Sequence, residues 1–157
     1  MCRMDQHNFS TNWHITYHFV WGPMRAKACL TGEIAKRLQA LLEEKAREEQ
    51  FDHLTLVVLP DRVYVAAEAP PTLAPHSIVC QLKAYTSRVL RDEFPELTRI
   101  PSLWTRAYLV LAGDDISADE ALRRFEEQVP KRRPRGRPAR LRTLIANQPE
   151  DDTCESV

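Results

Sequence analysis

The hydrophobic pattern begins with an alternating run from Trp13 to Trp21, with the sequence WHITYHFVW. Successive side chains of a β-strand point to opposite faces of a sheet, so the run has an apolar side and a more polar one. The apolar side carries Ile15, Tyr17, Phe19 and Trp21, and the other side carries His14, Thr16 and His18. We predict a half-buried strand that ends at Gly22-Pro23.

Two long segments have the three-and-four spacing of an amphipathic helix. The first runs from Thr31 to Gln50, with Thr31 as its N-cap and with apolar positions at Ile34, Leu38, Leu41, Leu42 and Ala46. The second has Pro75 in its first turn and ends at Phe94-Pro95. Its predicted buried stripe is Ile78, Leu82, Tyr85 or Val79, Val89 and Leu90.

A third, shorter helix is predicted from Ala118 to Val129. Ser117 precedes it, and Glu120 stands three residues later, which is the spacing of a capping box. We therefore expect Ser117 to be its N-cap.

Three further segments have the composition of strands. Residues 51–59 and 63–69 flank the turn signal Pro60-Asp61, which predicts a hairpin, and residues 103–112 form the last strand. The resulting order, β-α-β-β-α-β plus one helix, predicts an α+β fold of the ferredoxin-like (RRM-like) split βαβ type. We expect one four-stranded antiparallel sheet with two helices on one face, the other face open, and the third helix as an appendage.

Length and composition describe an ordinary globular chain of 157 residues, with 43% hydrophobic and 28% charged residues. We find no apolar run of membrane-spanning length, and the first twelve residues lack the hydrophobic centre of a signal peptide. The cysteines stand at positions 2, 29, 80 and 154, without a C-x-x-C pair, so we expect a reducing compartment. These features predict a cytoplasmic protein without membrane contact.

The formal net charge of zero hides an uneven distribution of charge. Seven basic residues and no acid lie between positions 131 and 142, namely Lys131, Arg132, Arg133, Arg135, Arg137, Arg140 and Arg142. Four acids follow within the last eight residues. We therefore predict a flexible N-terminus over 1–12, a folded domain over 13–130, and a disordered tail over 131–157 that is first basic and then acidic. The basic part is suited to phosphate binding.

No pattern of catalytic or metal-binding residues stands out from spacing alone. His14 and His18 share a strand face but stand about 13 Å apart, too far to hold one ion. For His18 we favour a hydrogen-bonded histidine that supports the sheet. The sequence contains neither a G-x-S-x-G elbow nor a glycine-rich phosphate loop.

Four segments, in order, carry a family resemblance. They are YHFVWGP at 17–23, LPDRVYV at 59–65, the second helix through EFPEL at 93–97, and LWT at 103–105 followed by Tyr108 and by RFEEQ at 124–128. The chain resembles the small HUH-type tyrosine transposases of single-strand-transposing insertion sequences, including their REP-associated relatives. The resemblance covers about residues 13 to 130.

The resemblance implies a particular chemistry and assembly. In this family two histidines on a central strand and a glutamine on the last helix hold a divalent cation, Mg²⁺ or Mn²⁺, on the scissile phosphate. A tyrosine of that helix attacks and forms a phosphotyrosine intermediate. The family implies a homodimer that binds single-stranded or hairpin DNA, in which each last helix completes the partner's site.

This chain departs from the family at the positions that do the chemistry. Arg62 and Tyr64 stand where the two histidines belong, and Arg124 stands where the tyrosine belongs, while Gln128 matches. A shift by one residue would place Phe125 at the nucleophile position instead. Guanidinium has no lone pair for a metal, and phenol is protonated near neutral pH. We therefore expect a degenerate member that binds DNA without cutting it and needs no cofactor, with Mg²⁺ or Mn²⁺ required only if the family activity survives.

Two alternatives stay open at this point. One is an active transposase that nicks and transfers strands through a rearranged site, with Tyr64 or Tyr108 as the nucleophile. The other is a regulatory ferredoxin-like module that binds a protein or a small molecule. For DNA binding, the candidate residues outside the tail are Arg62 and Arg124, as charge substitutes for the lost cation, together with Arg25, Lys27, Lys83 and Arg88.

Overall fold

A computed structural model describes residues 14–128 of the chain. The predictions for residues 1–12 and 131–157 lie outside these described residues. The strands and helices follow the predicted order: β1 (Thr16–Pro23), α1 (Gly32–Glu48), β2 (Asp52–Leu59), β3 (Arg62–Glu68), α2 (Pro75–Glu93), β4 (Trp104–Ala112) and α3 (Ala118–Gln128). Two 3₁₀ turns, η1 (Met24–Ala26) and η2 (Pro95–Arg99), follow β1 and α2. The α+β class and the four-stranded sheet are confirmed.

The strands form one antiparallel sheet in the order β2-β3-β1-β4. In the register of the two central strands, Val20 stands opposite Tyr64 and His18 opposite Ala66. The hairpin turn at Pro60-Asp61 joins β2 to β3, as predicted. β2 and β4 are the two edge strands, so the outer side of each has no neighbouring strand among the described residues.

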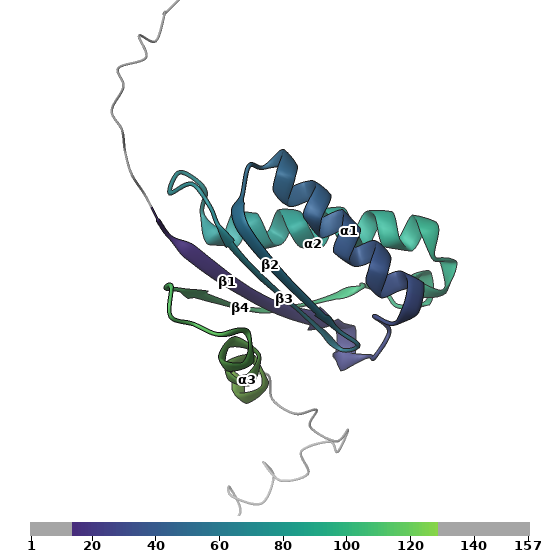
Figure 1. The fold of residues 1–157 in the computed structure, drawn as a ribbon. Helices are drawn as coiled ribbons and strands as arrows, with labels where there is room; N and C mark the ends of the chain where they lie inside the picture. The colour runs from purple at the N-terminus through teal and green to yellow at the C-terminus, as the bar shows by residue number, and fades with distance from the viewer. Residues whose placement is uncertain (1–13, 129–157) are drawn as a thin grey trace, which may run out of the picture.

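α1 and α2 pack on one face of the sheet (Figure 1). Their predicted apolar stripes are buried there against Phe19 and Trp21 of β1 and Val63 and Val65 of β3. Tyr85 is only partly buried, and Thr86 instead lies in the interior, where its hydroxyl accepts a hydrogen bond from the Trp104 indole at 3.1 Å. This face holds the main hydrophobic core.

Two predicted details of helix capping change. Thr31 has the extended backbone of an N-cap residue, but its side chain makes no capping hydrogen bond. The start of α1 is instead anchored by buried Leu30, whose N–H donates to the Pro60 carbonyl at 3.0 Å. At α3 the Ser117 hydroxyl accepts a hydrogen bond from the Glu120 N–H at 3.2 Å, as expected. The Glu120 carboxylate pairs with Arg124.

The second face of the sheet is not open, which corrects our prediction. α3 packs against it over β1, β3 and β4, below the sheet in Figure 1. Ala121 and Phe125 of α3 are buried there with Val20, Tyr64, Ala66 and Leu109. β1 is consequently buried on both faces from His18 onward, rather than half-buried, because its apparently polar side faces a second, smaller core.

Candidate nucleic-acid interface

Arg62 and Tyr64 project from β3 toward the same face of the sheet, because alternate residues of a strand share a face. That face is the one covered by α3, where Tyr64 is packed with Ala121 and Phe125. The strand positions 62 and 64 and the last helix are therefore close together in space. The resemblance implies a site made of these strand positions and a last helix, but with the helix supplied by the partner subunit; here the strand and the helix belong to one chain.

Tyr64 lies in a short chain of buried hydrogen bonds. Its hydroxyl is 2.8 Å from His18 Nδ1, and His18 Nε2 is 2.7 Å from the Gly113 carbonyl oxygen. A carbonyl can only accept, so Nε2 carries a proton, and in the neutral imidazole Nδ1 accepts the Tyr64 proton. Tyr64 is 2% exposed and His18 is 3% exposed. Burial raises the pKa of the Tyr64 phenol, so it stays protonated at neutral pH.

Arg62 pairs with two carboxylates, and one of them, Glu126, joins β3 to α3. Its guanidinium pairs with Asp61, at 3.0 Å between Nη2 and Oδ2, and with Glu126 of α3. The hydrogen bond from Arg62 lowers the pKa of Asp61, and the Asp61 and Glu126 carboxylates raise that of Arg62. Sequence analysis did not identify either carboxylate as a partner, because the contact depends on where α3 docks.

A shallow hollow of about 360 Å³ surrounds this ion pair, between the hairpin turn and α3. It is lined by Leu59, Pro60, Asp61, Arg62, Asp119, Leu122, Arg123 and Glu126. Gly22 of β1 fixes the turn beside it, because a Cβ at this position would lie 2.7 Å from the Asp61 carbonyl oxygen. The hollow contains three carboxylates and two guanidinium groups, so its charge is mixed.

Arg124 and Gln128 lie elsewhere on α3. Arg124 pairs with Glu120, one turn earlier on the helix, and Gln128 is exposed at the end of the described residues. Glu126, which binds Arg62, is two residues from Arg124 and therefore about 200° away around the helix. Arg62 and Arg124, the two proposed charge substitutes, thus lie on different sides of α3. Arg62 contacts the side that carries Glu126, and Arg124 lies on the side that carries Glu120.

The chain matches a family described as "Transposase IS200 like" over residues 11–128, which is most of its length. The protein belongs to the IS200-like transposase family. The family match spans both β3 and α3, so the grouping of Arg62, Tyr64 and the last helix lies inside the matched region.

Individual relatives agree with this assignment. The chain is 25% identical over 119 residues to the ISDra2 transposase TnpA of Deinococcus radiodurans, covering 74% of this chain and 85% of that one. It is 25% identical over 103 residues to the transposase for insertion sequence element IS200 of Salmonella typhimurium, covering 64% and 68% respectively. A crystal structure described as a Deinococcus radiodurans transposase has the same fold, with a TM-score of 0.68, 24% identity, and coverage of 76% of this chain and 94% of that chain.

The side chains at the family's metal positions do not fit a divalent cation. Arg62 offers no lone pair, and the Tyr64 hydroxyl is engaged by His18. Within residues 14–128, no three histidine, cysteine or carboxylate side chains are arranged to hold a metal ion.

The other predicted DNA-binding residues lie away from Tyr64. Arg25 and Lys27 are exposed in and after η1, and Lys83 and Arg88 lie on α2. Tyr108 of β4 packs partly against the α1/α2 core, so it is on the opposite sheet face from Tyr64. A rearranged site that combines Tyr108 with Arg62 is therefore not formed. The predicted tail residues Lys131, Arg132, Arg133, Arg135 and Arg137 lie outside the described residues.

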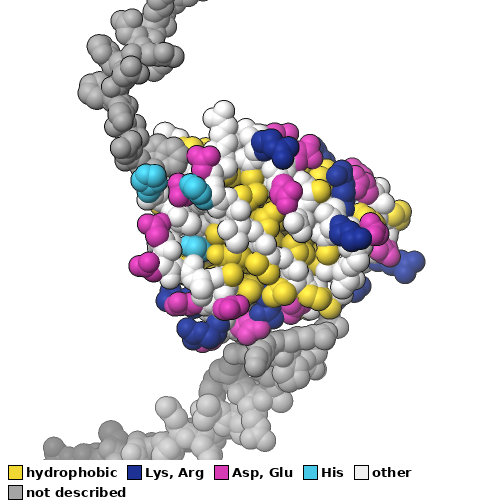
Figure 2. Space-filling model, in the orientation of Figure 1, with side chains coloured by type: hydrophobic (Ala, Val, Ile, Leu, Met, Phe, Trp, Pro, Cys, Tyr) yellow, Lys and Arg dark blue, Asp and Glu magenta, His cyan; other side chains and the backbone are white. Residues whose placement is uncertain are grey.

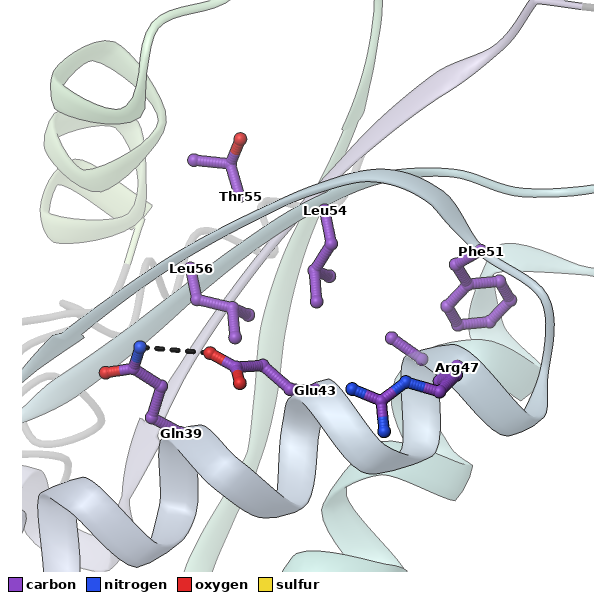
Figure 3. A pocket seen from close by; sticks show the side chains of 8 residues that line it. Gln39, Glu43, Arg47, Phe51, Leu54, Thr55 and Leu56 are labelled. Carbon is purple, nitrogen blue, oxygen red and sulfur yellow. Dashed lines mark hydrogen bonds between the residues drawn. The ribbon is translucent and has the colours of Figure 1, made fainter.

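A second hollow lies between α1 and the edge strand β2 (Figure 3). It measures about 650 Å³ and is lined by Gln39, Glu43, Ala46, Arg47, Phe51, Leu54, Thr55 and Leu56. Figure 2 shows apolar side chains gathered in the middle of this side of the molecule, with charged side chains around them. Every residue of β2 from Leu56 to Leu59 is only partly buried, so this edge of the sheet exposes apolar surface.

None of the helices in the described part of the chain is long and apolar enough to cross a membrane.

Proposed function

We propose that this member of the IS200-like transposase family binds single-stranded or hairpin DNA and does not cleave it. The proposal rests on the contacts and burial of two β3 residues beneath α3, Arg62 and Tyr64. Arg62 is held by two carboxylates, and Tyr64 is a buried, protonated phenol bonded to His18. The fold of the family is retained, whereas these two side chains help to dock α3 on the sheet.

Cleavage by the family reaction requires a metal-bound phosphate and an accessible phenol. Arg62 cannot coordinate a metal, and Arg124 cannot attack phosphorus as a nucleophile. Tyr64 is the only phenol among the described residues on this sheet face, and α3 covers it. We therefore propose that the protein works without a cofactor, and that Mg²⁺ or Mn²⁺ would matter only if the family activity survives.

The alternative of a rearranged active site has one observation in its favour. The Tyr64 hydroxyl lies 2.8 Å from an imidazole nitrogen, which is the pairing of a nucleophile with a general base. Access to Tyr64 would require α3 to leave the sheet, because Ala121 and Phe125 pack on it. If nicking were observed and Tyr64→Phe abolished it, this alternative would replace the proposal.

The experiment measures binding and cleavage on the same DNA. A labelled single strand that contains a hairpin is titrated with the full chain by fluorescence anisotropy, and the same mixtures with Mg²⁺ or Mn²⁺ are run on a denaturing gel. We expect saturable binding and an intact strand. Nicking would contradict the loss of cleavage, and absence of binding at low salt would favour the regulatory-module alternative.

The basic tail is proposed to strengthen binding through phosphate contacts. If all seven cations between positions 131 and 142 engage single-stranded DNA, they contribute about −5 to the slope of log affinity against log salt. Deletion of residues 131–157 should flatten the slope by that amount. An unchanged slope would remove the tail from the binding surface.

We also propose that the protein is a homodimer and acts in the cytoplasm. The exposed apolar edge of β2 supports association, because an uncovered edge strand of this kind favours pairing with another chain. The separated cysteines suit a reducing compartment. Light scattering at several protein concentrations distinguishes a dimer from a monomer.

A further inference from the structure

The cations on the described surface fall into two groups. Those on α1, β3 and α3 are mostly paired with carboxylates, namely Lys36, Arg37, Lys45, Arg62, Arg123 and Arg124. Eight cations within residues 14–128 take part in no ion pair, namely Arg25, Lys27, Arg47, Lys83, Arg88, Arg91, Arg99 and Arg106. Charges without a carboxylate partner are the ones free to meet a phosphate.

Four of these cations, Arg25, Lys27, Lys83 and Arg106, lie on β4 or next to it, and β4 is an edge strand of the sheet. The segment that carries Arg25 and Lys27 is tied to the start of β4, because the Met24 N–H donates to the Leu103 carbonyl at 2.8 Å. Arg106 is exposed on β4 itself. Lys83 reaches over from α2, and its Nζ donates to the Thr105 carbonyl at 2.7 Å. Segments that are distant in sequence therefore supply one row of positive charge.

Aromatic groups continue this row along the strand. Lys83 Nζ lies 5.5 Å from the centroid of the Tyr108 ring, and the Tyr108 hydroxyl is 2.6 Å from Nδ1 of the exposed His76. We call the surface formed by Arg25, Lys27, Lys83, Arg106, Tyr108 and His76 the β4 edge strip. Its β4 part, from Leu103 to Tyr108, is about 17 Å long at the rise of a strand.

We infer that the β4 edge strip binds the backbone of single-stranded DNA, an inference that rests on the proposed function and adds a surface to it. Cations in a row with aromatic rings among them are the features of single-strand binding platforms. Arg62 and Arg124, on the α3 side, are already held by carboxylates.

The test removes three charges of the strip from the full chain with Arg25→Gln, Lys27→Gln and Arg106→Gln together. Binding to an oligothymidine is measured by fluorescence anisotropy over a series of salt concentrations. Each phosphate contact on a single strand contributes about 0.7 to the slope of log affinity against log salt. We expect the slope to become shallower by about 2, with weaker binding at low salt.

A matched control loses the same charge elsewhere, through Lys36→Gln, Arg47→Gln and Arg99→Gln on the exposed surfaces of α1 and η2. Its slope should equal that of the unmodified chain. Equal flattening in both triple variants would mean that only net charge matters, and would overturn the inference.

The outcomes separate the inference from the proposed function. If the unmodified chain binds DNA and the strip variant keeps its slope, the inference alone fails. If the unmodified chain binds no DNA, the proposed function fails and the inference fails with it. Should the triple variant not fold by circular dichroism, Arg106→Gln alone replaces it, with an expected change in slope of about 0.7.

Discussion

On one face of the sheet, α1 and α2 enclose seventeen buried residues in one apolar cluster, whereas on the other face the shorter α3 buries a cluster of six. Beside the larger cluster the buried polar side chain is Thr86, whose hydroxyl is hydrogen-bonded to Trp104. The smaller one includes Tyr64 and lies beside His18 and Arg62, whose hydrogen bonds and ion pairs hold it together. The first face is therefore stabilised mainly by apolar packing, while the second combines modest packing with polar contacts at Arg62 and Tyr64.

This difference between the two faces shows that a residue at a position of the family site can have a structural role. At these positions a histidine pair and a tyrosine would serve chemistry in the family. Here Arg62 and Tyr64 connect β3 to α3 and to β1. In this structure the two side chains thus take part in holding a helix on the sheet.

The largest effect is expected in the main core. Leu38→Ala removes a side chain with 0% exposure and leaves a cavity, so it should lower the free energy of unfolding by about 2–5 kcal/mol. Urea unfolding measures the change. Because this core joins both helices to the sheet, hydrogen exchange should increase in all elements together, and an increase confined to α1 would contradict this account.

Phe125→Ala tests the smaller core. Phe125 is 8% exposed and packs in the six-residue cluster beneath α3. Because α3 buries only two of its side chains, we expect it to detach while the rest of the fold stays intact. We expect a loss of about 2 kcal/mol, below the usual cost for a buried phenylalanine. Hydrogen exchange should rise in α3 and not in α1 or α2. Equal increases on both faces would show that the two cores unfold as one unit.

Tyr64→Phe removes one hydroxyl from the buried chain of hydrogen bonds. His18 Nδ1 then lacks its partner, and the free energy of unfolding should fall by about 1–2 kcal/mol at neutral pH. Chemical denaturation with the unmodified chain as reference gives this difference. A change close to zero would mean that water or another group replaces the hydroxyl.

The same variant has a defined dependence on pH. Burial raises the pKa of Tyr64 in the folded protein, while in the unfolded chain the phenol ionises near its ordinary pKa of about 10. Stability from the protonated phenol is therefore present below about pH 10 and is lost as pH rises through the higher folded value. The stability advantage of the unmodified chain over Tyr64→Phe should shrink above that pH.

Glu126→Gln should have the smallest effect on stability. Its carboxylate is 54% exposed, and ion pairs at such positions contribute at most about 1 kcal/mol, which salt reduces further. The variant also frees Arg62 from one of its two carboxylates. Anisotropy should show slightly tighter DNA binding than for the unmodified chain, and unchanged or weaker binding would contradict a contact between Arg62 and phosphate.

The main core could be predicted from the sequence because its signals are local. Five apolar positions in α1 repeat at helical spacing, and Pro60-Asp61 marks the hairpin turn. The docking of α3 could not be predicted in this way, because only Ala121 and Phe125 are buried on it and two positions do not define a face that must be covered. The expectation of an open sheet face followed from that weak signal.

The sequence indicated which positions belong to the candidate site, but it did not indicate which side chains these residues contact. Counting along the chain placed Arg62, Tyr64 and Arg124 at the family positions, and the structure brings the strand residues beneath α3. The partners of these residues depend on sheet register and helix rotation. Tyr64 meets His18 because the two are diagonal neighbours across β1 and β3, and Arg62 meets Glu126 because of the side that α3 turns toward β3. The support role favoured for His18 is the one that the structure gives it.

The loss of cleavage is tested most directly by mass spectrometry of the full chain after incubation with hairpin-bearing single-stranded DNA and Mn²⁺. Strand cleavage by a tyrosine leaves the DNA covalently attached to the protein. We predict only the mass of the unmodified chain under denaturing conditions, with DNA bound in the native sample. A denatured species that carries an oligonucleotide on a tyrosine would contradict the account.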